Sequence, residues 1–164
     1  MKIADLVSRF KFYAQNHVDL RHVESDKRKQ SFFHLEGEEL QLGVQQGIKL
    51  PCLLLQTPET DKTGGFDQLQ ETTSFTYVVL KSLDKLSKAQ VLDDCKSVSD
   101  DILSLFAQDF VTEVFEGSLV STSEGMAGPF PNKLYGWGVS MVIEDAFNAE
   151  VNINKWLHLA DQGS

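Results

Sequence analysis

The stretch YGWGVSMVIE, residues 135 to 144, alternates between large and small side chains along its length. One side carries Tyr135, Trp137, Val139, Met141 and Ile143, and the other carries Gly136, Gly138, Ser140 and Glu144. A period of two residues is typical of a β-strand with one covered face. We therefore predict a strand whose bulky face packs on helices, while its small face accepts a close neighbour or faces solvent.

Two segments have the period of amphipathic helices. In residues 88 to 107 the apolar positions recur every three or four residues, at Val91, Cys95, Val98, Ile102 and Leu105 or Phe106. In residues 2 to 17 the apolar stripe holds Ile3, Leu6, Val7, Phe10, Tyr13, Ala14 and His17, and the outer side holds Lys2, Asp5, Arg9 and Gln15. The spacing predicts a helix in each segment.

The remaining apolar runs indicate strands. SFFHLE (31–36) is a candidate short strand, and TTSFTYVVLKSL (72–83) and residues 111 to 122 are rich in β-branched and aromatic residues. KLPCLLLQT (49–57) is apolar on both faces over Cys52 to Leu55, as in an interior strand covered on both sides. The order α-β-β-β-α-β-β predicts a single α+β domain over residues 1–164. Its sheet is mixed or antiparallel, with about five strands and two main helices on one face.

Two polar or glycine-rich segments, 57–71 and 123–133, are predicted as long loops. The second lacks the lysine and the following helix that a phosphate-binding loop needs, so a stiff tip that touches another protein is the better interpretation. Candidate interface residues in the two loops are Gly64, Gly65, Phe66, Pro129, Phe130 and Lys133.

Composition excludes several classes of function. A formal net charge of −9 argues against a nucleic-acid binder, because phosphate contacts need an excess of lysine and arginine. The longest unbroken apolar run is far too short to span a bilayer, and residues 1–10 lack the apolar region of a signal peptide. Cys52 and Cys95 fit small core residues better than a disulfide. We expect a cytoplasmic protein.

No residue pattern predicts catalysis or a cofactor. The histidines, His17, His22, His34 and His158, are scattered without a zinc-binding spacing. The pairs Asp93-Asp94 and Asp100-Asp101 lie on one helix face, where carboxylates diverge, and favour a solvated surface over a metal site. No nucleophile motif is present. We predict no enzyme, no metal and no cofactor; a hydrolase centred on acidic residues is the least favoured alternative.

The order of elements resembles that of the tail-terminator and tail-completion proteins of tailed bacteriophages and related contractile particles. The resemblance covers the N-terminal helix, the strands KLPCLLLQT and SFTYVVLKSL, the helix VLDDCKSVSDDILSLF and the closing strand YGWGVSMVIE. It implies a subunit that assembles into a ring, often a hexamer, on the end of a tail tube, where the ring joins the tube to the head or cap. It implies no catalytic residues.

The sequence thus predicts a non-enzymatic structural protein that forms a ring oligomer, with the two loops reaching the neighbouring subunit or the tube. It would act in the cytoplasm or within an assembled virion or tail-like particle. A small cytoplasmic adaptor that binds a partner protein through its loops is the alternative.

Overall fold

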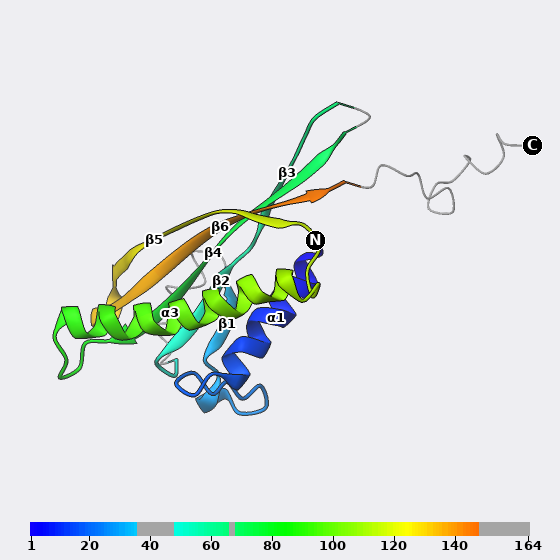
Figure 1. Ribbon diagram of the computed structural model, residues 1–164. Coiled ribbons are helices and arrows are strands. Elements are labelled where there is room, and N and C mark those ends of the chain that lie inside the picture. Colours follow the sequence, from blue (N-terminus) through cyan, green and yellow to red (C-terminus); the bar gives the residue numbers. More distant parts are fainter. Residues whose placement is uncertain (36–47, 66–67, 148–164) are drawn as a thin grey trace, which may run out of the picture.

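The computed structural model describes residues 1–35, 48–65 and 68–147. Its helical elements are α1 (Ile3–Asn16), α3 (Lys88–Val111) and the short 3-10 turns η1 (Lys27–Lys29) and η2 (Pro131–Lys133). Its strands are β1 (Phe32–Leu35), β2 (Cys52–Gln56), β3 (Glu59–Thr63), β4 (Gln70–Ser82), β5 (Ser118–Phe130) and β6 (Leu134–Ala146). The strands form one six-stranded sheet, and both helices lie on the same face (Figure 1). The predicted α+β class and helix placement are confirmed.

The sheet has the order β1-β2-β4-β6-β5, and β3 also pairs with β4. Only β1 and β2 are parallel; the other described pairs are antiparallel. The β4–β6 ladder runs the full length of both strands, from Gln70 opposite Ala146 to Ser82 opposite Leu134. This ladder is the long axis of the molecule.

The predicted helix at 88–107 is confirmed and extends to Val111. It begins with a capping box, because the Gln90 backbone N–H donates to Ser87 Oγ at 3.2 Å and the Ser87 N–H donates to Gln90 Oε1 at 2.9 Å. The sequence left Leu105 and Phe106 as alternatives for the last apolar position of this helix. The structure shows that Phe106 is fully buried, whereas Leu105 is exposed.

The prediction of a long loop at 57–71 is wrong. Strands β2 and β3 are both antiparallel to β4, and the register moves by only one residue between the pairs Leu55–Tyr77 and Glu59–Ser74. Together with β4 they form one extended hairpin. We call its outer part, residues 59–74, the arm. Every β3 side chain is exposed, so the strand is polar on both faces and lacks the apolar alternation that identifies strands in a sequence.

The loop predicted at 123–133 is also much shorter than expected. Strand β5 continues to Phe130, and the connection to β6 is the turn Pro131–Lys133, in which Asn132 and Lys133 have positive φ. The strand predicted over residues 111 to 122 begins later than expected, because β5 starts at Ser118. Polar side chains on an exposed edge strand explain why the end of β5 was predicted as a loop. The early start reflects the apolar residues Val111, Val114 and Phe115, of which Val111 ends α3 and the other two lie between α3 and β5.

The main core lies between the helices and the sheet and is centred on aromatic rings. Phe10 of α1 has ring-centroid distances of 5.7 Å to Phe75, 5.3 Å to Tyr77 and 5.5 Å to Phe106. These edge and tilted contacts bind both helices to β4. The bulky face of β6 joins the same cluster through Tyr135, Trp137, Val139, Met141 and Ile143. That part of the prediction is confirmed.

A smaller cluster covers the opposite face of the sheet. It contains the buried residues Cys52, Leu54, Val78 and Leu80, with Phe33, Ile48, Leu50, Ala127 and Phe130 packed against them. The strand β2 is therefore covered on both faces, as its unbroken apolar run predicts. Both cysteines are free and buried, which fits the predicted core role.

Alkaline pH is expected to destabilise this core. Burial raises the pKa of Tyr13 and Tyr77 well above the ordinary tyrosine value. Above a pH of about 10 the unfolded chain therefore releases tyrosine protons that the folded chain retains, so stability falls as pH rises. Each tyrosine contributes up to about 1.4 kcal/mol per pH unit. Urea unfolding at a series of alkaline pH values measures the slope.

The variant Tyr77→Phe tests the cause of this slope. It removes one titrating group together with the hydrogen bond that the Tyr77 hydroxyl donates to Ser99 O at 2.8 Å. We expect lower stability at neutral pH but a shallower loss above a pH of about 10. An unchanged slope would show that Tyr77 does not titrate on unfolding.

Candidate functional site

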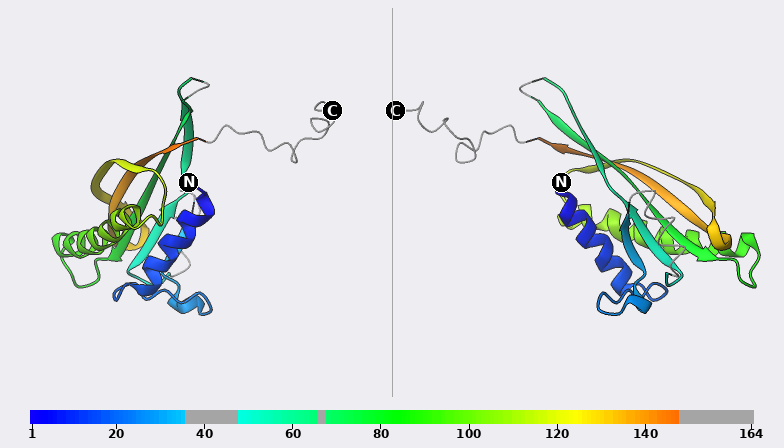
Figure 2. Two further views of the ribbon diagram at one scale, coloured as in Figure 1. Left: turned by 45° about the vertical axis from the view of Figure 1, so that its right-hand side comes forward. Right: turned by 180° about the vertical axis from the view of Figure 1, so that it is seen from behind.

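The arm is the most prominent projection of the described structure. Its β3–β4 hairpin extends beyond the helix-backed part of the sheet, away from both helices (Figure 2). Strand β1 pairs with β2 only, so the outer edge of β3 has no strand partner among the described residues. Its backbone N–H and C=O groups on that edge are available to another chain.

Two of the candidate interface residues lie at the tip of the arm. Gly64 has a φ of +116°, and a Cβ there would come closer than 3.0 Å to the backbone oxygen of Gln68. The turn therefore requires glycine at this position. The Gln68 N–H donates to the Gly65 carbonyl at 3.0 Å and closes the turn. Phe66, the third candidate in this segment, lies outside the described residues.

The other three candidates lie at the opposite end of the molecule. Pro129, Phe130 and Lys133 sit at the β5–β6 turn, beside the Ser82–Leu134 end of the ladder. The two sets of candidate residues are therefore not brought together. Phe130 is not at a projecting tip, because it is half-buried against the second cluster. Pro129 and Lys133 are exposed.

An open groove of about 1040 Å³ lies at the base of the arm. Val114, Phe115 and Phe147 supply its apolar lining, and Phe147 also carries the Lys62 ammonium 3.7 Å above its ring. Its rim holds five carboxylates, Asp5, Glu71, Glu113, Glu116 and Asp145, and three cations: Lys2, Arg9 and the Met1 ammonium, which lies 3.5 Å from Glu71 Oε1 and 3.4 Å from Asp145 Oδ2. We call this feature the groove. An apolar floor with an acidic rim suits a positively charged protein segment.

Arg9 is held beside the groove by the most buried charge of the described chain segments. Its Nε and Nη2 donate to the two oxygens of Asp109 at 2.6 Å each, and the Tyr13 hydroxyl also donates to Asp109. The Asp109 side chain is 3% exposed. The hydrogen bond to Asp109 raises the pKa of Arg9, so the guanidinium keeps its positive charge over the ordinary pH range. This cluster fastens α1 to α3 and frames the groove.

Sequence reasoning missed this cluster, because Arg9 falls on the predicted outer side of the first helix. One signal could have found it: Asp109 continues the apolar stripe of α3 at the spacing Ile102, Phe106, Asp109. A carboxylate on the inner face of a helix requires a cation.

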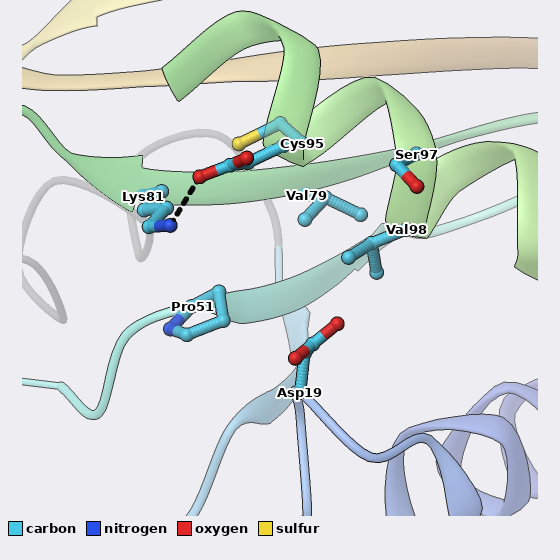
Figure 3. Close-up of a pocket in the computed structure, with 8 residues that line it drawn as sticks. Asp19, Pro51, Val79, Lys81, Cys95, Ser97 and Val98 are labelled. Carbon is cyan, nitrogen blue, oxygen red and sulfur yellow. Dashed lines mark hydrogen bonds and ion pairs between the residues drawn. The ribbon is translucent and has the colours of Figure 1, made fainter. Parts of the chain in front are cut away.

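A second, smaller cavity of about 270 Å³ lies between α3 and the sheet and holds Lys81, Asp94 and Cys95 (Figure 3). Lys81 Nζ lies 2.5 Å from Asp94 Oδ2. Burial raises the pKa of the Cys95 thiol to about 12. The thiol is therefore protonated near neutral pH and is a poor nucleophile.

The acidic face of α3 is divided among separate partners. Asp94 pairs with Lys81, Asp100 with Lys96 at 2.9 Å, and Asp101 lies 3.3 Å from His17 Nε2. Among the described residues, no three histidine, cysteine or acidic side chains lie close enough to hold a metal ion. His17 is partly buried at the end of α1, as predicted.

His22 has a structural role that its sequence context does not reveal. It is buried, and its Nδ1 accepts the backbone N–H groups of Ser31 at 3.0 Å and Phe32 at 3.1 Å. These two bonds hold the start of β1 against the segment that follows α1. His34 is exposed, with Nε2 3.4 Å from Thr57 Oγ1, and His158 lies outside the described residues.

No helix within residues 1–35, 48–65 and 68–147 is long and apolar enough to cross a membrane. No protein-family model matches the chain, and a search of curated proteins finds no significant match.

Proposed function

We propose that this protein is a non-enzymatic ring-forming subunit that closes the end of a tail tube in a phage or phage-tail-like particle. The observation that carries the proposal is the arm, a hairpin in which β3 buries no side chain and leaves one edge without a strand partner in the described structure. A strand that adds nothing to its own core is best explained by a contact outside the subunit.

The sheet offers two different edges for such contacts. Strand β5 lies at the end of the strand order, and its outward edge is long and rich in exposed serine and threonine. Contacts between unlike surfaces of identical subunits generate closed rings when the rotation between neighbours closes. A subunit with two unlike free edges is therefore suited to a ring, which we propose contains about six copies on the basis of the resemblance.

The partners in this proposal are further copies of the chain, the tail tube, and the head-joining or cap proteins. The protein would be found in the cytoplasm or in the assembled particle. The chemistry of the described residues supports a structural role: the Cys95 thiol is protonated, and Asp94, Asp100 and Asp101 of α3 pair with neighbouring cations or with His17.

The first test of the proposal is the mass and shape of the purified protein. We expect analytical ultracentrifugation across a concentration series to show one discrete oligomer, and electron microscopy to show rings. If the rings need a template, they should appear when tail tubes are added. A protein that stays monomeric at high concentration and also with tubes would contradict the proposal and favour a monomeric adaptor.

Shortening the arm is expected to abolish the ring without unfolding the subunit. Replacing residues 62–71 by Asn-Gly joins Asp61 to Thr72, which are opposite each other in the hairpin. Because β3 has no buried side chain and the replacement removes only the last two pairs of the β4–β6 ladder, Gln70–Ala146 and Glu71–Asp145, the midpoint of thermal unfolding should move by less than about 5 °C. Ultracentrifugation should show monomers.

The control keeps the length and polarity of the arm by replacing Thr60 and Thr63 with serine. It should assemble as the unaltered protein does. Rings that persist in the shortened variant would show that the arm is not a subunit contact.

A further inference from the structure

The charges of the described residues are segregated along the β4–β6 ladder. The groove, with five carboxylates and three cations, lies at the Gln70–Ala146 end. Glu113 and Glu116 of its wall form no ion pair with another described residue. The exposed residues Lys85, Lys88 and Lys133 lie at the Ser82–Leu134 end, about 40 Å away along the strands. None of the three lysines forms an ion pair with another described residue. Among the described residues, the groove therefore carries more carboxylates than cations, and the lysines outnumber the single Asp84 carboxylate at the opposite turns.

The basic end has a definite shape. The β4–α3 connection, residues 83–87, is a tight turn in which the Leu86 N–H donates to the Leu83 carbonyl at 2.6 Å. Leu86 is 37% exposed and lies between Lys85 and Lys88 in the chain. We call residues 83–88 the knob. It presents Leu86 between the ammonium groups of Lys85 and Lys88, and it also carries the exposed Asp84 carboxylate, which accepts a hydrogen bond from Ser82 Oγ at 2.8 Å.

The groove has the complementary character. Val114 is 48% exposed and lies on the groove wall beside Phe115, while Glu113 and Glu116 flank these two residues in the chain. An exposed leucine between lysines thus matches an apolar floor between carboxylates. Such matched charges favour one orientation of docking and oppose others.

We infer that the knob of one copy docks into the groove of the next copy, so that the chain assembles head to tail. This inference rests on the proposed function and names the contact between neighbouring subunits. A second copy is the favoured occupant, because the same chain carries both surfaces. With a net charge of −9, contacts between like faces are repulsive, whereas this contact joins opposite charges. A ring requires each contact to join two unlike surfaces of the subunit, as the knob and the groove would do.

Charge-reversal variants of the knob and the groove test this contact separately from other interfaces. The knob variant carries Lys85→Glu and Lys88→Glu, and the groove variant carries Glu113→Lys and Glu116→Lys; all four residues are exposed. We expect each variant alone to assemble at least roughly tenfold more weakly than the unaltered protein. Sedimentation at low and high salt measures assembly, and circular dichroism verifies the fold.

Mixing the two variants gives the decisive result. The reversed knob of one is then complementary to the reversed groove of the other, so the equimolar mixture should recover assembly, as should a chain carrying all four substitutions. A control with Lys27→Glu and Arg28→Glu makes the same charge change at exposed residues of η1 and should assemble normally.

The outcomes distinguish this inference from the proposed function. Normal rings from both variants would overturn the inference alone, because the ring would then be held by other contacts. Loss of assembly in the single variants without recovery in the mixture would also overturn it. An unaltered protein that never forms an oligomer would overturn both.

Discussion

An Arg9→Met variant is expected to lose about 3 to 5 kcal/mol of its free energy of unfolding. Methionine keeps most of the side-chain volume but leaves the Asp109 carboxylate, which is 3% exposed, without its counter-charge. Only the Tyr13 hydroxyl would still donate to that carboxylate from a side chain. Chemical denaturation with urea measures the loss, and comparison with a surface ion pair shows whether burial is its cause.

The matched surface pair is Lys96 and Asp100, which are joined at 2.9 Å with exposed fractions of 39% and 50%. Lys96→Met should leave the free energy of unfolding nearly unchanged, because both charges of the pair are exposed to solvent. A third variant replaces the whole buried cluster, with Arg9→Met, Asp109→Leu and Tyr13→Phe. It should be more stable than Arg9→Met alone, because no uncompensated charge or hydroxyl remains. An Arg9→Met variant as mild as Lys96→Met would show that the cluster does not anchor α1.

A Gly136→Ala variant is expected to lose about 3 kcal/mol or more, or to fail to fold. A Cβ at this position would come closer than 3.0 Å to the Val79 backbone oxygen and to the Leu80 side chain. The oxygen belongs to the strand that pairs with β6, so it cannot move without disturbing the long ladder. Thermal and urea unfolding measure the effect.

Gly138→Ala is the control, because Gly138 lies two residues away on the same strand face. Its nearest contact would be Val78 Cγ2 at 3.6 Å, an ordinary van der Waals distance. We expect the Gly138 variant to fold with nearly unchanged stability. If both variants lost the same stability, the close approach of β4 would not explain why glycine occupies position 136, and backbone flexibility would be the better explanation.

Strict periodicity made most of the fold predictable. The alternation of residues 135 to 144 and the helical stripe of α3 each record one covered face, and the structure confirms both. The small face of β6 was less well defined by its sequence. Gly136 is buried against the chain's own β4, a packing constraint that depends on which strand lies alongside.

The candidate site was harder to predict because its signals are not periodic. Strand β3 is exposed on both faces, so its polar sequence has the composition of a loop. The groove combines residues from the N-terminus and first helix, the Gln70–Ala146 end of the β4–β6 ladder and the segment after α3. Such a set is defined by tertiary structure alone. Arg9 was assigned to a helix surface, and its partner lies a hundred residues later.

Since β3 contributes no side chain to either hydrophobic cluster, selection on its residues is separable from selection on folding. A few substitutions in the arm could therefore change the protein surface that it binds, and related proteins could carry different arms. The helix-backed sheet would stay the same in both cases. Divergence in such a protein should concentrate in residues 59–63, and the core under α1 and α3 should change most slowly.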